Sequence, residues 1–196
     1  MGKIIGITGG IASGKSTVTN FLRQQGFQVV DADAVVHKLQ KPGGRLYQVL
    51  VQHFGHAILL ENGELNRPLL ASLIFSNPEE QEWSKQTQGE IIREELAALR
   101  DQLAQTEAIF FMDIPLLFEQ DYASWFDETW LVYVDYDIQL ERLMKRDQLS
   151  KEIAESRLAT QWSLEEKKKL ASHILDNNGS RDQLVSQVVK LLEGGD

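Results

Sequence analysis

A glycine-rich stretch near residue 10 carries residue types that bind phosphate. In GGIASGKST (9–17) a glycine is followed, after four residues, by glycine, lysine and serine. Glycines allow the backbone to turn tightly and to point successive N–H groups at an anion. The lysine brings a cation to the β- and γ-phosphates, and the serine hydroxyl can ligate Mg²⁺. The pattern predicts a nucleotide phosphate site formed by Gly10, Ile11, Ala12, Ser13, Gly14, Lys15, Ser16 and Thr17, and the absence of an N-K-x-D motif for guanine argues against a GTPase.

Acidic residues follow two apolar runs further along the chain. Asp113 ends IFFMD (109–113), as the carboxylate of a Walker B strand does, and is predicted to serve Mg²⁺; the alternative is an Asp that merely ends a buried strand. Asp31 and Asp33 follow a second apolar run. On an extended chain they share a face, and a carboxylate there could orient or deprotonate an attacking hydroxyl. For each of the two aspartates the residues leave an equal alternative, an N-cap for the helix expected after Asp33.

Basic and amide side chains gather in the last third of the sequence. Arg142 and Arg146 are four residues apart, so on a helix they share a face and could converge on one polyphosphate. A solvated helical face with Glu–Arg pairs explains them as well. Asn177 follows the last apolar run, where its amide could pair with the edge of adenine or simply form a turn. The three lysines at 167–169 are interpreted as solvated surface.

The elements that must position these residues alternate between strands and helices. Short apolar runs at 3–8, 27–33, 108–115, 129–135 and 172–176 are predicted to be strands. Helical periodicity is found at 16–26 and from Pro78 to about Gln105, where Ile91, Ile92, Leu96, Leu99 and Leu103 form the apolar stripe. Nearly continuous apolar strands separated by helices predict a parallel sheet covered on both faces. The expected fold is one three-layer α/β unit with right-handed crossovers.

Composition excludes several classes of protein. The chain has 196 residues, a net charge of −9 and no cysteine, so disulfides and Cys-based metal sites are excluded. The acidic balance argues against a nucleic-acid partner. No signal-peptide pattern or apolar run of 18 residues is present. We therefore expect a cytoplasmic protein with no membrane association and no obligate protein partner.

Seven segments together resemble bacterial dephospho-CoA kinases in order and spacing over nearly the whole chain. They are TGGIASGKS (8–16), DAD (31–33), LNR (65–67), IF-NPEE (74–80), PLLFE (115–119), QLERLMKRD (139–147) and DNNG (176–179). The resemblance implies ATP-dependent phosphorylation of the 3′-hydroxyl on the ribose of dephospho-CoA, the last step of coenzyme A synthesis. It also implies a P-loop kinase fold with strand order 2-3-1-4-5, a helical CoA-side insertion at about 34–107 and a lid at about 139–165.

The resemblance also implies roles for single residues. It favours Asp33 over Asp31 as the acceptor-side carboxylate, and it places Arg142 and Arg146 in the lid. Arg67 is then expected to bind a phosphate of the CoA substrate, with a surface arginine as the alternative, and Phe118 and Glu119 are expected to line the acceptor pocket. The implied small-molecule ligands are ATP, Mg²⁺ and dephospho-CoA.

The sequence departs from the family pattern at one place. The family commonly has His-Pro about ten residues after NPEE, whereas this chain has Gly89-Glu90. Two other functions stay open on the residues alone: a P-loop kinase with a different small acceptor, and a nucleotide-binding module without activity. The joint presence of Lys15, Ser16, Asp33 and Asp113 argues against the second.

Overall fold

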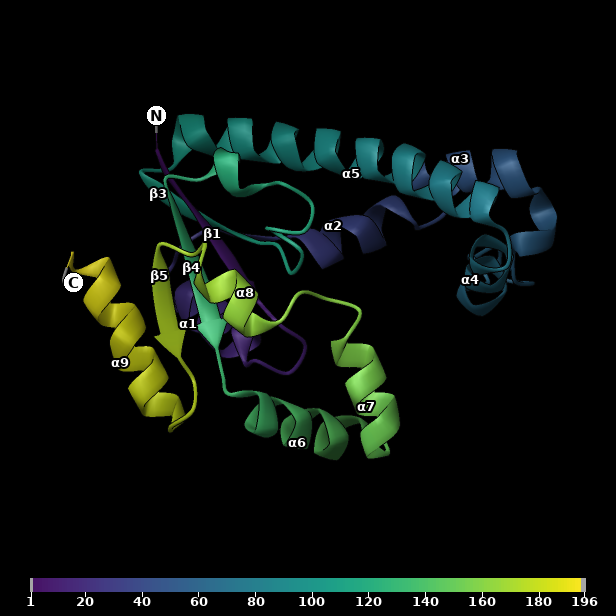
Figure 1. The fold of residues 1–196 in the computed structure, drawn as a ribbon. Helices are drawn as coiled ribbons and strands as arrows, with labels where there is room; N and C mark the ends of the chain where they lie inside the picture. The colour runs from purple at the N-terminus through teal and green to yellow at the C-terminus, as the bar shows by residue number, and fades with distance from the viewer. Residues whose placement is uncertain (1, 195–196) are drawn as a thin grey trace. The chain divides into compact units, whose positions relative to one another are not determined.

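Five strands form one parallel sheet in the computed structural model, which describes residues 2–194 (Figure 1). Their order is β2-β3-β1-β4-β5, as expected. The strands are β1 (Lys3–Gly9), β2 (Val29–Asp31), β3 (Ile109–Asp113), β4 (Glu128–Tyr133) and β5 (His173–Asp176). The central strand β1 is buried from Ile4 to Gly9, because it has β3 on one side and β4 on the other.

The chain divides into two units, the first taking the residues up to Val30 and from Leu103 onward, and the second Asp31–Gln102. Helices of the first unit are α1 (Lys15–Gln24), α6 (Tyr136–Asp147), α7 (Lys151–Leu158), α8 (Leu164–Lys168) and α9 (Arg181–Leu192), with a short turn η2 (Ala123–Trp125). The second unit contains α2 (Ala32–Leu39), α3 (Arg45–Phe54), η1 (His56–Ile58), α4 (Arg67–Phe75) and most of α5 (Pro78–Thr106).

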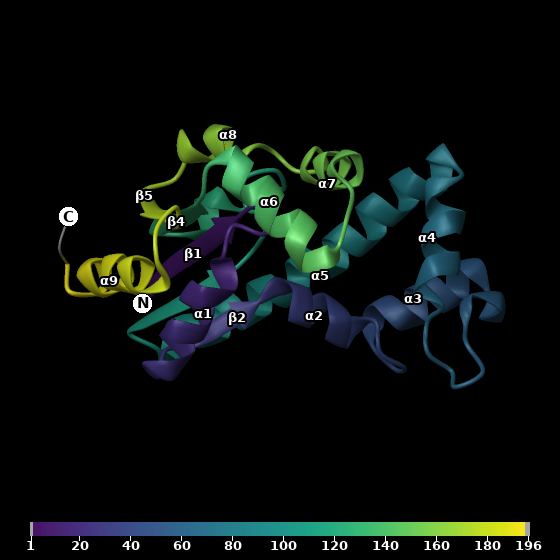
Figure 2. The ribbon, with the colours of Figure 1, turned by 90° about the horizontal axis from the view of Figure 1, so that it is seen from below.

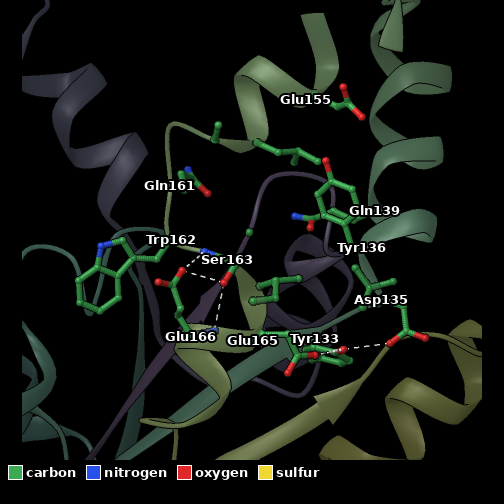
Figure 3. Close-up of a pocket in the computed structure, with 15 residues that line it drawn as sticks. Tyr133, Asp135, Tyr136, Gln139, Glu155, Gln161, Trp162, Ser163, Glu165 and Glu166 are labelled. Carbon is green, nitrogen blue, oxygen red and sulfur yellow. Dashed lines mark hydrogen bonds between the residues drawn. The ribbon is translucent and has the colours of Figure 1, made fainter. Parts of the chain in front are cut away.

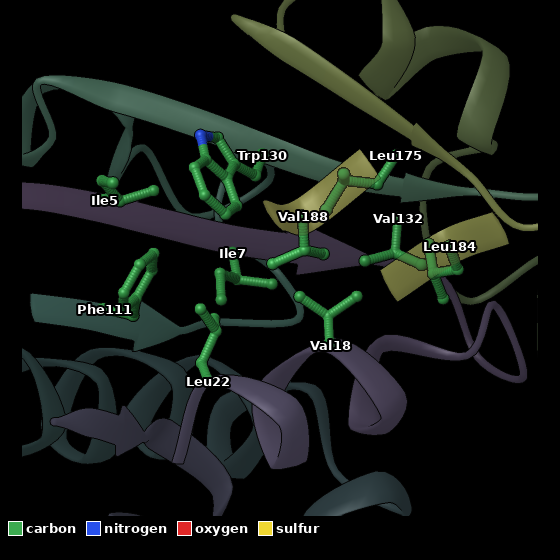
Figure 4. Packing of buried hydrophobic residues seen from close by; sticks show 10 residues of the cluster. All are labelled: Ile5, Ile7, Val18, Leu22, Phe111, Trp130, Val132, Leu175, Leu184 and Val188. Carbon is green, nitrogen blue, oxygen red and sulfur yellow. The ribbon is translucent and has the colours of Figure 1, made fainter. Parts of the chain in front are cut away.

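The first unit has three layers, with α1 and α9 on one face of the sheet and α8 on the other (Figure 2). On the α1 and α9 face, apolar side chains from both helices and four strands interlock (Figure 4). The fully buried members of this cluster include Ile7, Val18, Leu22, Phe111, Val132, Leu175, Leu184 and Val188. On the opposite face Leu164 of α8 packs against Leu131 and Tyr133 of β4. This burial is the main stabilising term and fixes the strand ends that carry the loops.

The second unit is helical, with its own apolar core. That core contains Leu39, Leu46, Leu50, Ile58, Leu65, Leu70 and Ile91. Of the predicted stripe on α5, Ile91 and Leu96 are buried, and the other members are half-buried. Gly89 lies inside the helix α5, which is continuous at the place where the family pattern has His-Pro. A Cβ at Gly89 would meet no atom within 4 Å.

The second strand is shorter than predicted, and this corrects two expectations about the aspartates beside it. β2 ends at Asp31, whose side chain accepts a hydrogen bond of 3.0 Å from the backbone N–H of Ala34 and caps α2. Helical geometry therefore begins at Ala32, and Asp33 lies in the first turn of α2. The two aspartates therefore do not share the face of a strand, and the helix-cap alternative holds for Asp31 and is wrong for Asp33.

Candidate active site

The glycine-rich segment connects β1 to α1 and adopts a conformation that requires its glycines. Gly14 has a φ of 93° and directly precedes the first helical residue, Lys15. A Cβ on Gly14 would lie 2.0 Å from Nδ2 of Asn177. At Gly10 a Cβ would lie 2.5 Å from Nε2 of Gln139. Both glycines therefore permit other side chains to approach the loop closely.

Two amide side chains hold the outer side of this loop. Nδ2 of Asn177 donates to the carbonyl of Ser13 at 2.8 Å, and Nε2 of Gln139 donates to the carbonyl of Ile11 at 2.7 Å. In a trans peptide the N–H points opposite to the C=O. The N–H groups of Ala12 and Gly14 are thereby directed to the other side of the loop, the orientation that an anion cradle needs.

Lys15 and Asp113 form an ion pair at the carboxyl ends of neighbouring strands. The parallel register places Asp113 of β3 beside Ile7 of β1, and Lys15 follows six residues after the end of β1. Nζ of Lys15 lies 2.5 Å from Oδ1 of Asp113, and the two side chains are 17% and 7% exposed. The predicted cation and the predicted Walker B carboxylate are thus brought together.

The predicted Mg²⁺ ligands supply the right kind of atom. Ser16 is exposed in the first turn of α1, so its hydroxyl is accessible, and Asp113 contributes a carboxylate. Hydroxyl, carboxylate and phosphate oxygens are the hard ligands that Mg²⁺ prefers. Among the described residues no group of three or more His, Cys, Asp or Glu side chains could hold a metal, so such an ion would depend on the nucleotide for further ligands.

The two arginines of α6 have separate partners. Arg142 donates to the backbone carbonyl of Asn177 at 3.0 Å. Arg146 forms two hydrogen bonds with Asp147, at 2.7 and 3.1 Å, and Arg157 adds a third at 2.9 Å. The bonds from Arg146 and the charge of Arg157 hold the pKa of Asp147 below its usual value. The structure therefore places Arg142 beside the loop after β5, and convergence of both arginines on a polyphosphate stays a prediction.

Asn177 has a role that the sequence did not suggest. It is buried, and its amide nitrogen is engaged by the phosphate loop instead of pointing freely outward. Asn178 next to it accepts a hydrogen bond from the N–H of Asp135 at 2.8 Å. The adenine contact stays a prediction for Asn177. In the structure its side chain instead stabilises the phosphate loop through the hydrogen bond to Ser13, which we call the brace of the loop.

The loop after β3 holds the two residues predicted to line an acceptor pocket. Phe118 is 8% exposed, and Leu117 before it is fully buried. Oε1 of Glu119 lies 2.8 Å from Nζ of Lys167 and accepts a 3.2 Å hydrogen bond from the N–H of Trp162. The expectation that residues 167–169 form solvated surface is wrong for Lys167, which is fully buried. The sequence does contain an indication of this burial. Lys167 follows the apolar Leu164 by three residues on α8, and that spacing places the two side chains on one helical face.

In the second unit, Arg67 and Asp33 are both exposed. An NH2 group of Arg67, the first residue of α4, lies 2.8 Å from Nδ1 of His37 on α2. These side chains and Lys41 border a hollow of about 80 Å³, which also contains Glu64. Arg67 and Lys41 bring two positive charges to this hollow, which suits an anionic ligand, while Nδ1 of His37 accepts from Arg67. His37 is exposed, and its contact with Arg67 joins two helices that are distant in sequence.

A larger cavity of about 370 Å³ opens between α6, α7 and α8 beside Gly10 (Figure 3). It is mostly apolar, with carboxylates of Asp135, Glu155, Glu165 and Glu166 around it. The pKa of Tyr133 is raised by the hydrogen bond from its hydroxyl to Glu165, by burial, and by a second hydrogen bond to Asp135, so the phenol stays neutral. Four carboxylates make this cavity unsuited to a polyphosphate.

Comparison with known proteins decides the family. A family model described as dephospho-CoA kinase matches residues 3–183. The chain belongs to the dephospho-CoA kinase family. A dephospho-CoA kinase of Streptococcus pneumoniae is 83% identical over 195 residues, which are 100% of this chain and 97% of that protein.

Solved structures agree with this family. A dephospho-CoA kinase from Campylobacter jejuni is 28% identical with a TM-score of 0.75 and covers 99% of both chains. A Thermus thermophilus protein is 33% identical with a TM-score of 0.79, covering 98% of this chain and 97% of its own. In the part of the chain that the structure describes, no helix is long and apolar enough to cross a membrane.

Proposed function

We propose that this chain transfers the γ-phosphoryl group of ATP to the ribose 3′-hydroxyl of dephospho-CoA. The observation that supports this most strongly is the Lys15–Asp113 pair at the end of a braced phosphate loop, within a chain that matches the dephospho-CoA kinase family from residue 3 to residue 183. Phosphoryl transfer requires mainly positioning and stabilisation of charge, and this loop provides N–H donors, a cation and oxygen ligands at one place.

The proposed roles on the ATP side follow the geometry. N–H groups from Gly10 to Thr17 hold the phosphates, and Lys15 neutralises charge that develops on the transferred group. Mg²⁺, held by Ser16 and Asp113, would supply further neutralisation at the phosphate oxygens. When a nucleotide binds, the ammonium of Lys15 must interact with both Asp113 and a phosphate. Before binding, the 2.5 Å contact with Asp113 holds the ammonium at the loop.

The proposed roles on the acceptor side belong to Asp33, Arg67, Phe118 and Glu119. Asp33 orients the hydroxyl and accepts its proton, for which an exposed carboxylate with no capping duty is suited. Arg67, with His37 beside it, binds a phosphate of dephospho-CoA. Phe118 and Glu119 line the acceptor pocket.

An ADP-release assay tests the function. With Mg²⁺ and ATP, ADP should form rapidly when dephospho-CoA is added and hardly at all without it, and removing Mg²⁺ with a chelator should stop the reaction. Product analysis should show one added phosphate on the 3′-oxygen. ADP release driven better by a nucleoside or a small hydroxy acid would contradict the proposal, as would ATP binding with no transfer to any acceptor.

A second prediction concerns Arg142, whose guanidinium lies beside the loop after β5. In Arg142→Ala the rate of phosphoryl transfer should fall more than ATP affinity does, because we propose that the arginine reaches the phosphates when the lid closes. Single-turnover transfer and ATP affinity are measured for Arg142→Ala and for Lys145→Ala, an exposed neighbour. A loss confined to ATP affinity would show that Arg142 binds only the ground state.

A further inference from the structure

Lys167 is a buried lysine whose ammonium group contacts the segment that follows β3. It is fully buried at the end of α8, where Nζ donates to the carbonyl of Pro115 at 2.9 Å and pairs with Glu119 at 2.8 Å. Both partners belong to the segment that follows β3. Burying an ammonium is costly, and an apolar side chain of similar size is often equally stable there. Stability alone therefore does not account for a lysine at this position.

The carboxylate of Glu119 is satisfied on one side only. Its side chain is 11% exposed, and Oε1 receives Nζ of Lys167 and the N–H of Trp162. Oε2 is buried and has no hydrogen-bond partner among residues 2–194. A buried carboxylate oxygen without a donor is unfavourable. Lys167 and Trp162 thus fix the direction of a carboxylate whose second oxygen has no donor among the described residues.

The chemistry of Oε2 selects the kind of group it can receive. A carboxylate oxygen accepts hydrogen bonds and repels phosphate, so the partner is an O–H or N–H of the ligand and not its phosphates. Dephospho-CoA offers both, as ribose hydroxyls and as amide N–H groups, and Glu119 stands in the loop that we propose lines the acceptor pocket. ATP also carries ribose hydroxyls and an adenine amino group, so the choice of dephospho-CoA rests on the position of Glu119 in this loop.

We propose that Lys167 is a positioning residue for the acceptor site. It holds Glu119 so that Oε2 accepts a hydrogen bond from a hydroxyl or an amide N–H of dephospho-CoA. The inference rests on the proposed function, since it takes dephospho-CoA as the acceptor.

Steady-state kinetics of Lys167→Met test this role. Loss of one charge-assisted hydrogen bond should raise the KM for dephospho-CoA about 10- to 100-fold, with the KM for ATP and the ATP dissociation constant unchanged. Lys167→Arg should recover a large part of the loss, because a guanidinium can also reach Glu119. Lys169→Met, at an exposed position on the same turn, is the matched control and should behave as wild type.

A double variant separates positioning from folding. Lys167→Met with Glu119→Gln removes both charges together, so no unpaired ion is buried, and its acceptor KM should match that of Glu119→Gln alone. An unchanged acceptor KM in Lys167→Met, or KM values for both substrates that rise together with lower thermal stability, would overturn the proposal. Wild-type enzyme that fails to phosphorylate dephospho-CoA would instead refute the proposed function.

Discussion

Lys15→Ala should abolish ATP turnover. Lys15 is the only basic residue in the segment 9–17, so no other side chain of the loop can replace its charge. Transition-state stabilisation of this kind amounts to about 3–4 kcal/mol or more, which corresponds to a rate loss of roughly 10²–10³-fold. Single-turnover transfer from ATP to dephospho-CoA measures the loss directly.

The Lys15 experiment needs a control for stability, because the substitution removes one ion-pair partner of Asp113, whose side chain is 7% exposed. Loss of an ion-pair partner from a buried carboxylate can lower the free energy of unfolding. Thermal unfolding of Lys15→Ala should therefore be compared with the assay temperature, and Lys85→Ala, an exposed lysine on α5, should leave both rate and stability unchanged. Turnover within a few-fold of wild type in Lys15→Ala would show that the loop lysine is dispensable.

Asp33→Asn should lower the rate of transfer to dephospho-CoA by roughly 10²–10⁴-fold, the usual effect of a positioned general base. ATP affinity should be nearly unchanged, since the proposed contact is with the acceptor. Because Asp31 caps α2, loss of a cap cannot explain an effect at Asp33. The competing role for Asp33 is a favourable charge in the first turn of α2, worth about 0.3–1 kcal/mol of stability and no rate effect.

The neighbouring aspartate is the matched control. Asp31→Asn keeps a capping side chain and should change the transfer rate little, whereas Asp31→Ala should lower the free energy of unfolding by about 0.5–2 kcal/mol. Chemical denaturation and single-turnover kinetics on the three variants distinguish the roles. A near-normal transfer rate in Asp33→Asn would remove Asp33 from the acceptor site.

Most of the sheet could be predicted because its strands are apolar throughout. β1, β3 and β4 are buried on both faces, which leaves continuous apolar runs in the sequence. The error at β2 has a local cause. The run 27–33 looks extended, but the side chain of Asp31 captures the N–H of Ala34 and starts the helix two residues early. The strand order came from the family resemblance, since periodicity does not specify which strands are neighbours.

The candidate site was predictable where residue type determines chemistry and unpredictable where packing determines it. Glycine, lysine and serine at fixed spacing predict a phosphate loop, and the structure adds an ion pair between Lys15 and Asp113 that the sequence analysis did not predict. The brace from Asn177 and the buried position of Lys167 depend on contacts between segments distant in sequence. A run of three lysines gives no sign that one of them faces inward unless helical spacing from Leu164 is considered.

The brace across the phosphate loop has a consequence for the newly made chain. Ser13 and Asn177 are 164 residues apart, so at ribosomal speeds of about 5–20 residues per second the loop waits roughly 10–30 s for its amide partner. The first sheet partner of Lys3 is Ile109, so β1 also emerges long before it can pair. During that interval the isoleucines of β1 have no sheet to enter, so the nascent polypeptide exposes an apolar strand.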